Sequence, residues 1–356
     1  MRIGVLGLIQ QSLKKTFLHP DQSLGENEMS NETQLIDIRE ALRQAIDEEV
    51  ARDENVFVMG EEVGEYNGPY KVTKGLLEKW GPKRIIDTPI SELGFTGLCV
   101  GAAMTGLRPI VDFMSFNFSF VAADQIISNA IKMHYMSGNR FSVPIVFRGP
   151  NGAAAQVSCQ HSHCVEAIYG NLPGLIILAP ANAYDAKGLL KSAIRNNNPV
   201  LFLESEMSYS DKMEVPVREY LIPIGQAHVS LEGEHVTLVS HSRMVNYCLE
   251  AAQQLSKKGI RAEVINLRTV KPLDIATICA SIRKTNRAVL VEEGHSFGGI
   301  ASEVAFQIME HAFDYLDAPI QRVCQYETPL PYSKVLEKIT IPNVERILAS
   351  VHKTLE

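Results

Sequence analysis

From residue 36 onward, hydrophobic and polar positions follow two alternating periods along the chain. Within residues 37–53 the apolar side chains recur every three or four positions, which predicts an amphipathic helix with Asp37 as its N-cap. Short apolar runs predict buried strands at 56–60, 84–88, 109–113, 143–149, 175–180 and 199–205. Helical stretches at 92–106, 117–136 and 183–195 separate most of these strands. Buried strands that alternate with helices are typical of a parallel sheet covered on both faces.

A second, smaller series of the same kind occupies the end of the chain. Prolines and charges interrupt the pattern over residues 209–226, which we interpret as a linker. Predicted strands at 236–240, 261–267, 287–293 and 320–324 then alternate with predicted helices at 246–258, 273–284 and 299–313. The sequence therefore predicts an α/β protein with two doubly wound domains, residues 34–208 and residues 227–356.

The composition excludes several classes of protein. The net charge is −7 and the 34 Lys and Arg residues form no basic stripe, so we expect no nucleic-acid partner. Pro, Gly or charged residues break every apolar run before about 18 residues, so we expect no membrane span. The six cysteines are scattered without a Cys-x-x-Cys pair, which is typical of a protein in a reducing compartment.

The first 33 residues do not follow this pattern. Residues 1–20 contain no acidic residue and a few basic ones, but fewer Arg and Ser than a mitochondrial transit peptide usually carries. We interpret residues 1–33 as a disordered extension, with a targeting segment as the alternative. We expect a cytoplasmic protein if the chain is bacterial, and a protein of the mitochondrial matrix if residues 1–33 are a transit peptide.

Glu92 lies in an unusual context, the stretch "DTPISELGFTG". The predicted strand ends, Pro89 follows it, and a helix rich in small residues begins, so Glu92 lies at a strand-to-helix junction, where α/β proteins bind ligands. One interpretation is an acidic residue that interacts with the helix dipole. The other starts from the small residues, which let another backbone approach closely. A carboxylate buried at such a contact needs a partner, and a ligand nitrogen could be that partner.

Two further segments carry candidate chemistry. In "DFMSFNFSFVAADQ" (112–125) the alternating Phe residues are core aromatics, or one of them stacks on a flat heterocycle. In "RGPNGAAAQVSCQHSHCVEA" (148–167) a tight turn and a small-residue loop lead to Cys159, His161, His163 and Cys164. These four residues are too closely spaced for a usual zinc site. A histidine in such a loop is better suited to handling protons, with an ordinary surface histidine as the alternative.

Taken together, these segments resemble a known family, the beta subunits of the decarboxylating component of the pyruvate dehydrogenase complex. That family belongs to the thiamine-diphosphate enzymes of the transketolase-like superfamily. The resemblance runs from about residue 36 to residue 356. It is carried by "GEEVGEYNGPYKVTKGL", "RIIDTPISELGFTG", "GLRPIVDFMSFNFSF", "VPIVFRGPNGAA", "QHSH", "PGLIILAPANAYDAKGLLKSAIRNNNPV", "VSHSR", "VINLRTVKPLD" and "PLPYSKVLE".

The resemblance implies the domain organisation and the partners. It implies a pyrimidine-binding domain followed by a smaller transketolase C-terminal-like domain, and a heterotetramer of two alpha and two beta chains. In the family the alpha chain carries a Gly-Asp-Gly motif that holds Mg²⁺ and the cofactor diphosphate. This sequence contains no Gly-Asp-Gly, so the resemblance implies that the chain shares thiamine diphosphate with an alpha subunit. The dihydrolipoyl acetyltransferase core is the other implied partner.

The resemblance also implies roles for single residues. Glu92 matches the family glutamate that hydrogen-bonds N1′ of the cofactor's aminopyrimidine, and Phe118 matches the ring that packs on the pyrimidine. His161 matches a histidine near the thiazolium that assists later steps and the passage of the acetyl group to the lipoyl arm. A structural potassium ion is implied at the positions of Ile145, Ala193, Ile194, Asn196 and Asn198, largely through carbonyl oxygens. This chain has Asn196 where animal members usually have Asp.

The activity implied by the resemblance is oxidative decarboxylation of pyruvate with reductive acetylation of lipoyl groups, which feeds formation of acetyl-CoA after glycolysis. The nearest alternative is a beta subunit of a branched-chain 2-oxo acid or acetoin dehydrogenase. The alternative from another class is a non-catalytic assembly subunit, against which the presence of both Glu92 and His161 argues.

Overall fold

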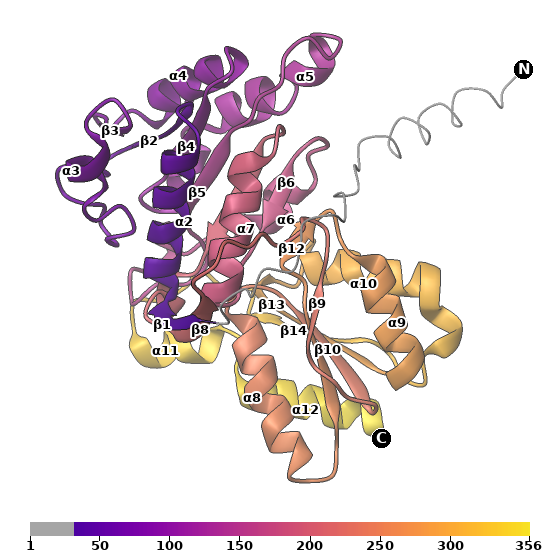
Figure 1. The fold of residues 1–356 in the computed structure, drawn as a ribbon. Helices are drawn as coiled ribbons and strands as arrows, with labels where there is room; N and C mark the ends of the chain where they lie inside the picture. Colours follow the sequence, from indigo (N-terminus) through magenta and orange to yellow (C-terminus); the bar gives the residue numbers. More distant parts are fainter. Residues whose placement is uncertain (1–31) are drawn as a thin grey trace, which may run out of the picture. The chain divides into compact units, whose positions relative to one another are not determined.

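This computed structural model describes residues 32–356, so the expectation of a disordered extension lies almost entirely outside the described residues. Seven strands form the first sheet, six of them parallel (Figure 1). Their order is β12 (Thr269–Lys271), β6 (Ile176–Leu178), β7 (Val200–Glu204), β5 (Val146–Pro150), β4 (Arg108–Asp112), β2 (Val56–Gly60) and β3 (Ile85–Asp87). The six strands predicted in this half of the chain are confirmed.

Helices cover both faces of this sheet because successive side chains of a buried strand point to opposite faces. On β4, Ile110 packs in one core cluster with α2 (Ile38–Arg52) and α7 (Ala183–Arg195), while Val111 packs in another with α4 (Glu92–Met104). Helix α2 begins where the sequence predicts it, because Asp37 accepts a hydrogen bond from the backbone N–H of Glu40 at 2.8 Å.

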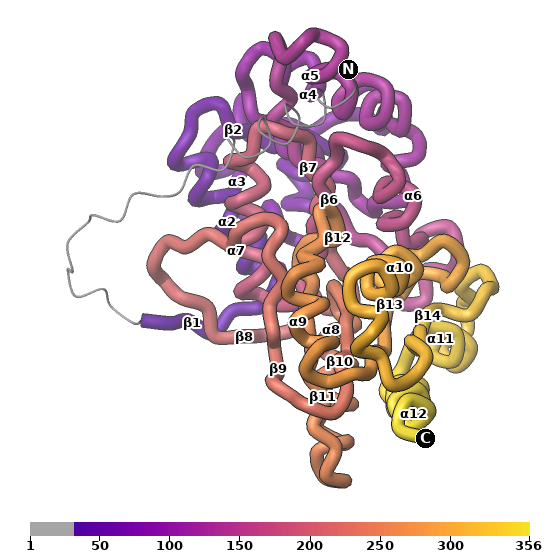
Figure 2. The backbone as a smooth tube through the Cα atoms, turned by 90° about the vertical axis from the view of Figure 1, so that its right-hand side faces the viewer, coloured from indigo at the N-terminus to yellow at the C-terminus, as the bar shows by residue number. Residues whose placement is uncertain are grey.

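The second sheet has five strands, with β9 antiparallel at its edge. Their order is β14 (Gln321–Gln325), β13 (Ala288–His295), β10 (Val236–Ser240), β11 (Ala262–Asn266) and β9 (His228–Leu231). Helices α8 (Met244–Ser256) and α12 (Val344–Leu355) cover one face, and α9 (Ile275–Thr285) and α10 (Ile300–Ala312) cover the other (Figures 1 and 2). The predicted α/β fold with two doubly wound domains is confirmed.

Several elements were not predicted from the sequence. Strand β12 comes from the second half of the chain but pairs antiparallel with β6 of the first sheet. Residues 209–226, interpreted as a linker, include β8 (Lys212–Pro216), which pairs antiparallel with β1 (Thr33–Asp37). The remaining short elements are α3 (Leu76–Trp80), η3 (Cys159–His161), α6 (Glu166–Gly170), η4 (Glu206–Ser208), η5 (Phe313–Tyr315) and α11 (Lys334–Thr340).

The stretch predicted to be helical at 117–136 is helical, but it is not one continuous α-helix. The segment instead forms a 3-10 turn η1 (Phe116–Phe120), a π-helical turn η2 (Gln125–Ala130) and the short helix α5 (Met133–Met136). Phe116 and Ser119 are both fully buried, three positions apart. A 3-10 turn repeats every three residues and places both on the buried side, whereas the sequence pattern alone favoured a continuous α-helix.

The two domains share one hydrophobic core. The cluster that contains Val111 and Phe147 of the first sheet also contains Leu290 of β13 and Val304 of α10. A buried polar contact adds to this: Asp185, at the start of α7, accepts hydrogen bonds at 2.7 Å from Asn266 Nδ2 and from Arg268 Nε. In residues 32–356 no helix is both long and apolar enough to cross a membrane.

Arg148 forms a buried ion cluster across three neighbouring strands. It lies on β5, is 2% exposed, and donates to Glu204 on β7 through Nε at 2.6 Å and Nη2 at 2.5 Å, and to Asp112 on β4 through Nη1. Burial disfavours the charged guanidinium, but the charges of Asp112 and Glu204 outweigh this and raise the pKa of Arg148. Tyr209 also donates to Glu204, at 2.7 Å.

Replacing Arg148 should strongly destabilise the protein. We expect Arg148→Ala to lower the free energy of unfolding by about 3–5 kcal/mol, because Asp112 and Glu204 would remain buried without a counter-charge. Arg261→Ala is the matched control, since water screens the exposed Arg261–Glu234 pair and its loss should hardly change the free energy of unfolding. Urea unfolding followed by circular dichroism measures both. Equal effects of the two substitutions would contradict the importance of the buried cluster.

Candidate active site

The site is built at the carboxyl ends of three adjacent parallel strands. Strands β4, β5 and β7 end at one edge of the sheet, and the segments that follow them carry Phe118, His161 and Glu206. Together with Tyr70, these side chains line a cavity of about 230 Å³. The edge beyond the carboxyl ends of parallel strands is where α/β folds bind ligands.

Within this cavity the structure brings together two of the three residues predicted from the sequence. The Phe118 and His161 rings have centroids 5.4 Å apart and meet edge to face, at an interplanar angle of 73°. On the opposite lining, Tyr70 donates to Glu206 Oε2 at 2.8 Å. Burial and the hydrogen bond to Glu206 raise the pKa of Tyr70, so its hydroxyl stays protonated at neutral pH.

The loop that carries His161 is closed at its base by Asn151. The Asn151 amide donates to Glu166 Oε1 at 2.8 Å, and its oxygen accepts from the backbone N–H of Val165 at 3.0 Å. One residue further, the Gly152 N–H donates to the carbonyl oxygen of His163 at 2.9 Å. These bonds join the two ends of the loop, which has few apolar side chains that could pack against the rest of the domain.

His163 points to a different cavity from His161. Its backbone N–H and its ring Nδ1 both lie within hydrogen-bonding distance of Asn117 Oδ1, at 2.9 and 2.5 Å. The acceptor oxygen of Asn117 places the proton on Nδ1, because the Asn117 amide nitrogen donates to Ser115. His163 and His295 line a larger cavity of about 800 Å³ between the two domains. Burial, with the charges of His161 and His295, lowers the pKa of His163.

Glu92, the third predicted residue, is the first residue of α4 and is 7% exposed. It is not among the residues that line the cavity of Phe118 and His161. Its charge acts on Glu61, directly after β2: burial and the charge of Glu92 raise the pKa of Glu61. Two carboxylates therefore lie close together at the ends of β2 and β3.

Polar atoms around this acidic pair lack partners. Glu61 Oε1, Thr88 Oγ1 and Thr96 Oγ1 are buried and make no hydrogen bond within the described part of the chain. Thr88 follows β3 and Thr96 lies one helical turn after Glu92. Buried polar groups are nearly always hydrogen-bonded, so this edge fits a bound molecule that offers nitrogen donors and acceptors. The residues present thus fit the polar edge of a heterocycle such as an aminopyrimidine.

The five positions implied for potassium gather where α7 ends beside β5. Arg108 Nη1 donates to the carbonyl oxygens of Ile194 and Asn196, at 2.9 and 3.1 Å. The other implied carbonyls, of Ile145 and Ala193, each accept one backbone hydrogen bond, and Asn196 Oδ1 accepts from Asn198. A carbonyl oxygen accepts two bonds, so each of these main-chain carbonyls retains one position for a cation, whereas Asn198 fills both positions of Asn196 Oδ1.

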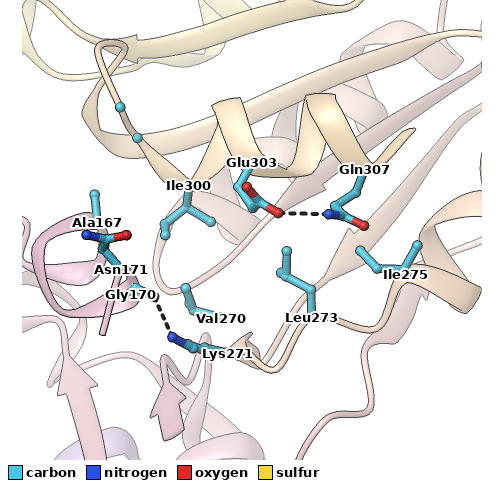
Figure 3. Close-up of a pocket in the computed structure, with 12 residues that line it drawn as sticks. Ala167, Gly170, Asn171, Val270, Lys271, Leu273, Ile275, Ile300, Glu303 and Gln307 are labelled. Carbon is cyan, nitrogen blue, oxygen red and sulfur yellow. Dashed lines mark hydrogen bonds between the residues drawn. The ribbon is translucent and has the colours of Figure 1, made fainter. Parts of the chain in front are cut away.

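No group of three or more His, Cys, Asp or Glu side chains within residues 32–356 is arranged to hold a metal ion. A third cavity of about 540 Å³ lies between α6, β12 and α10 (Figure 3). Lys271 borders it, but its ammonium group donates to the carbonyl oxygens of Gly170 and Leu172, both at 2.6 Å. The one basic side chain of that cavity is thus bound to backbone.

Sequence reasoning missed Tyr70, Glu206 and Glu61. Glu61 directly follows a predicted strand, in "VFVMGEEVGEYNGPY", which is the same signal that singled out Glu92. Tyr70 and Glu206 gave no such signal, because each lies in an irregular segment and the two are 136 positions apart in the chain.

Comparison with known proteins gives two family matches. Residues 34–212 match the model "Transketolase, pyrimidine binding domain" and residues 225–347 match "Transketolase, C-terminal domain". The chain is 55% identical over 325 residues to "Pyruvate dehydrogenase E1 component subunit beta, mitochondrial" of Bos taurus, covering 90% of each chain. It is 52% identical over 328 residues to the protein of that name from Dictyostelium discoideum, covering 91% of this chain and 92% of the relative.

A solved structure shares the fold. It is titled "Split gene transketolase, inactive beta4 tetramer", and it superposes with a TM-score of 0.74 at 23% sequence identity. The match covers 90% of this chain and 98% of the other.

The effect of the Glu92 charge on the pKa of Glu61 can be tested by substitution. Glu92→Gln should lower the pKa of Glu61, because it removes a neighbouring negative charge while Glu61 stays buried. A carboxyl group whose pKa is raised by folding stabilises the protein at low pH, and that contribution is lost as pH rises through its folded pKa. In Glu92→Gln this loss should therefore occur at lower pH than in the wild type.

Carboxyl ¹³C NMR titration and unfolding experiments between pH 4 and 8 measure these two effects. Glu78→Gln is the control, because Glu78 is exposed on α3. An unchanged pKa of Glu61 in Glu92→Gln would mean that the two carboxylates do not interact.

Proposed function

The chain belongs to the family of pyruvate dehydrogenase E1 component beta subunits, and from this premise we propose that it acts in the oxidative decarboxylation of pyruvate and the reductive acetylation of lipoyl groups. The observation that carries the proposal is identity above half of all positions over about nine-tenths of both chains. The geometry of the strand edge that bears Phe118, His161 and Glu92 supports it.

Thiamine diphosphate, when bound, supplies the carbon nucleophile that attacks the keto group of pyruvate. The protein's task is to bind that cofactor and to set its electronics. Glu92 would do this through a hydrogen bond to N1′ of the aminopyrimidine. In a buried site such a bond would be strong, and by favouring a proton on N1′ it would favour loss of a proton from the 4′-amino group, which makes that nitrogen basic enough to accept one. The unpartnered polar atoms beside Glu92 support this assignment.

Phe118 and His161 have complementary tasks. The Phe118 ring provides a flat apolar surface for the pyrimidine and keeps water from it. His161 lies against that ring, and its imidazole nitrogens can donate or accept a hydrogen bond, which suits the later steps in which the acetyl group passes to the lipoyl arm. Both side chains project from loops at the strand edge rather than from within a strand.

We propose that an alpha subunit completes the site, in a heterotetramer of two alpha and two beta chains. The sequence has no Gly-Asp-Gly motif for Mg²⁺ and diphosphate, and Glu92 lies outside the cavity of Phe118 and His161. A second chain would supply the missing wall and the Mg²⁺ site. The dihydrolipoyl acetyltransferase core would be the further partner, since its lipoyl groups receive the acetyl unit.

Three alternatives have their own tests. A branched-chain 2-oxo acid or acetoin dehydrogenase would prefer those substrates over pyruvate, and a non-catalytic assembly subunit would tolerate loss of Glu92. For the compartment, the relatives' names include "mitochondrial", so we propose a transit peptide within residues 1–33. The N-terminal sequence of the native protein distinguishes this from a cytoplasmic chain.

The central prediction concerns Glu92. In a purified alpha–beta complex supplied with Mg²⁺ and thiamine diphosphate, we expect release of CO₂ from pyruvate. Glu92→Gln should reduce the rate by about 10²–10⁴-fold, because the variant loses a proton-transfer partner but keeps the shape of the side chain. The rate is measured with ¹⁴C-labelled pyruvate, with Glu78→Gln as the control.

Two results would contradict the proposal. A wild-type complex that releases no CO₂ from pyruvate, or that prefers 3-methyl-2-oxobutanoate, would exclude pyruvate as the substrate. Full activity in Glu92→Gln would favour the non-catalytic alternative.

A potassium ion is a separate proposal, at the positions of Ile145, Ala193, Ile194, Asn196 and Asn198. It rests on the carbonyl positions that these residues retain. Replacing K⁺ with choline in the buffer should lower the melting temperature of the complex by a few degrees, because a ligand that binds only the folded state stabilises it. Asn196→Asp should restore stability at lower K⁺ concentration, since a carboxylate binds the ion more strongly. A melting temperature independent of K⁺ in both proteins would exclude the site.

A further inference from the structure

The loop before His161 contains two residues in a strained backbone conformation. Gln156 and Ser158 have φ angles of +57° and +66°, in the left-handed region of backbone conformations that residues other than glycine rarely adopt. Such conformations persist only where the surrounding structure holds them, and they cluster at functional sites. Gln156 and Ser158 lie five and three positions before His161, so the contacts that hold them also affect the position of His161.

The C-terminal domain holds both of them. The Gln156 backbone N–H is shared between the carbonyl oxygen of Ala154 at 2.9 Å and Glu337 Oε1 at 3.2 Å, and the Gln156 side-chain amide donates to Glu337 Oε2 at 3.3 Å. The Ser158 hydroxyl donates to the carbonyl oxygen of Leu330 at 3.3 Å. Glu337 and Leu330 belong to the segment around α11, more than 170 positions away in the chain.

A third contact supports the start of the same loop. Glu293, after the centre of β13, accepts a hydrogen bond from the Ala153 backbone N–H, and it is held in place by Arg243 Nε at 2.6 Å. Ala153 also packs in a small buried cluster with Leu330 and Ile341. The loop is thus attached to the C-terminal domain at residues 153, 156 and 158.

Glu337 and Thr340 are the two buried residues of α11. Most of α11 is exposed, including the apolar side chains of Val335, Leu336 and Ile339, whereas Glu337 is only 6% exposed. In residues 32–356 Glu337 makes no ion pair, and the side-chain bonds to its carboxylate come from Gln156. Burying a carboxylate without a counter-charge is costly, so a helix that serves only as structure would not place it there.

We propose that Glu337 is a positioning residue of the active site: by holding Gln156 in its left-handed turn, it fixes the loop that places His161 against Phe118. The C-terminal domain then contributes to the site without lining it. The inference rests on the proposed function for the role of His161, but the position of the loop can be measured independently of any reaction.

The test uses the assembled alpha–beta enzyme with Glu337→Ala, Glu337→Gln and Glu337→Ala/Gln156→Gly. Hydrogen exchange of the backbone amides in residues 153–161 should be about tenfold faster in Glu337→Ala than in the wild type and intermediate in Glu337→Gln. Transfer of the acetyl group to a lipoyl domain should lose about tenfold in kcat with little change in the KM for pyruvate, because a displaced catalytic group costs rate.

The second substitution separates positioning from general stability. Glycine adopts the left-handed conformation without strain, so Gln156→Gly should restore much of the exchange protection and activity lost in Glu337→Ala. Glu345→Gln, an exposed position on α12, is the control and should behave as the wild type. If Glu337 only stabilised α11, Gln156→Gly would not restore the activity and exchange protection lost in Glu337→Ala.

Unchanged hydrogen exchange in residues 153–161 of Glu337→Ala, or the absence of rescue by Gln156→Gly, would overturn the inference. These outcomes do not depend on pyruvate chemistry. A wild-type complex that releases no CO₂ from pyruvate would instead overturn the proposed function. The hydrogen-exchange comparison would still show whether Glu337 holds the loop. If Glu337→Ala does not assemble, Glu337→Gln gives the same exchange comparison with the side-chain shape preserved.

Discussion

The buried guanidinium of Arg148 is the contact on which the candidate site depends. It binds carboxylates on the strands to either side, so it fixes the relative positions of β4, β5 and β7 at their carboxyl ends. The segments that follow these strands carry Phe118, His161 and Glu206 in turn. Arg148, Asp112 and Glu204 are buried, so their charges must remain paired. This pairing fixes the edge of the sheet from which the site residues project.

The site itself is divided within this chain. The acidic pair of Glu61 and Glu92 lies at the ends of β2 and β3 with unpartnered polar atoms around it. The aromatic and imidazole groups lie in a cavity at the ends of β4 and β5. Both parts face where a parallel sheet binds ligands, and a second chain would join them into one pocket. This division is the reason why we propose that an alpha subunit completes the site.

The loop that carries His161 joins the two domains functionally. It is small and polar, so it cannot be held by its own apolar side chains; bonds of Asn151 close its base, and carboxylates and a carbonyl of the C-terminal domain hold residues 153, 156 and 158. The second domain is therefore more than a platform for assembly. Its shared core with the first domain and the buried Asp185 contact keep these anchors at a fixed distance from the loop.

The sequence by itself determined the two series of strands and helices, because burial on one or both faces imposes a local period on side chains that can be read from neighbouring positions. It also singled out Glu92, at a junction of strand and helix, and His161, in the loop after a tight turn. Only the tertiary structure decided that β12 joins the first sheet, that Phe118 meets His161, and that Glu337 holds Gln156. These contacts join residues up to about 180 positions apart, and no local period carries information about such distances.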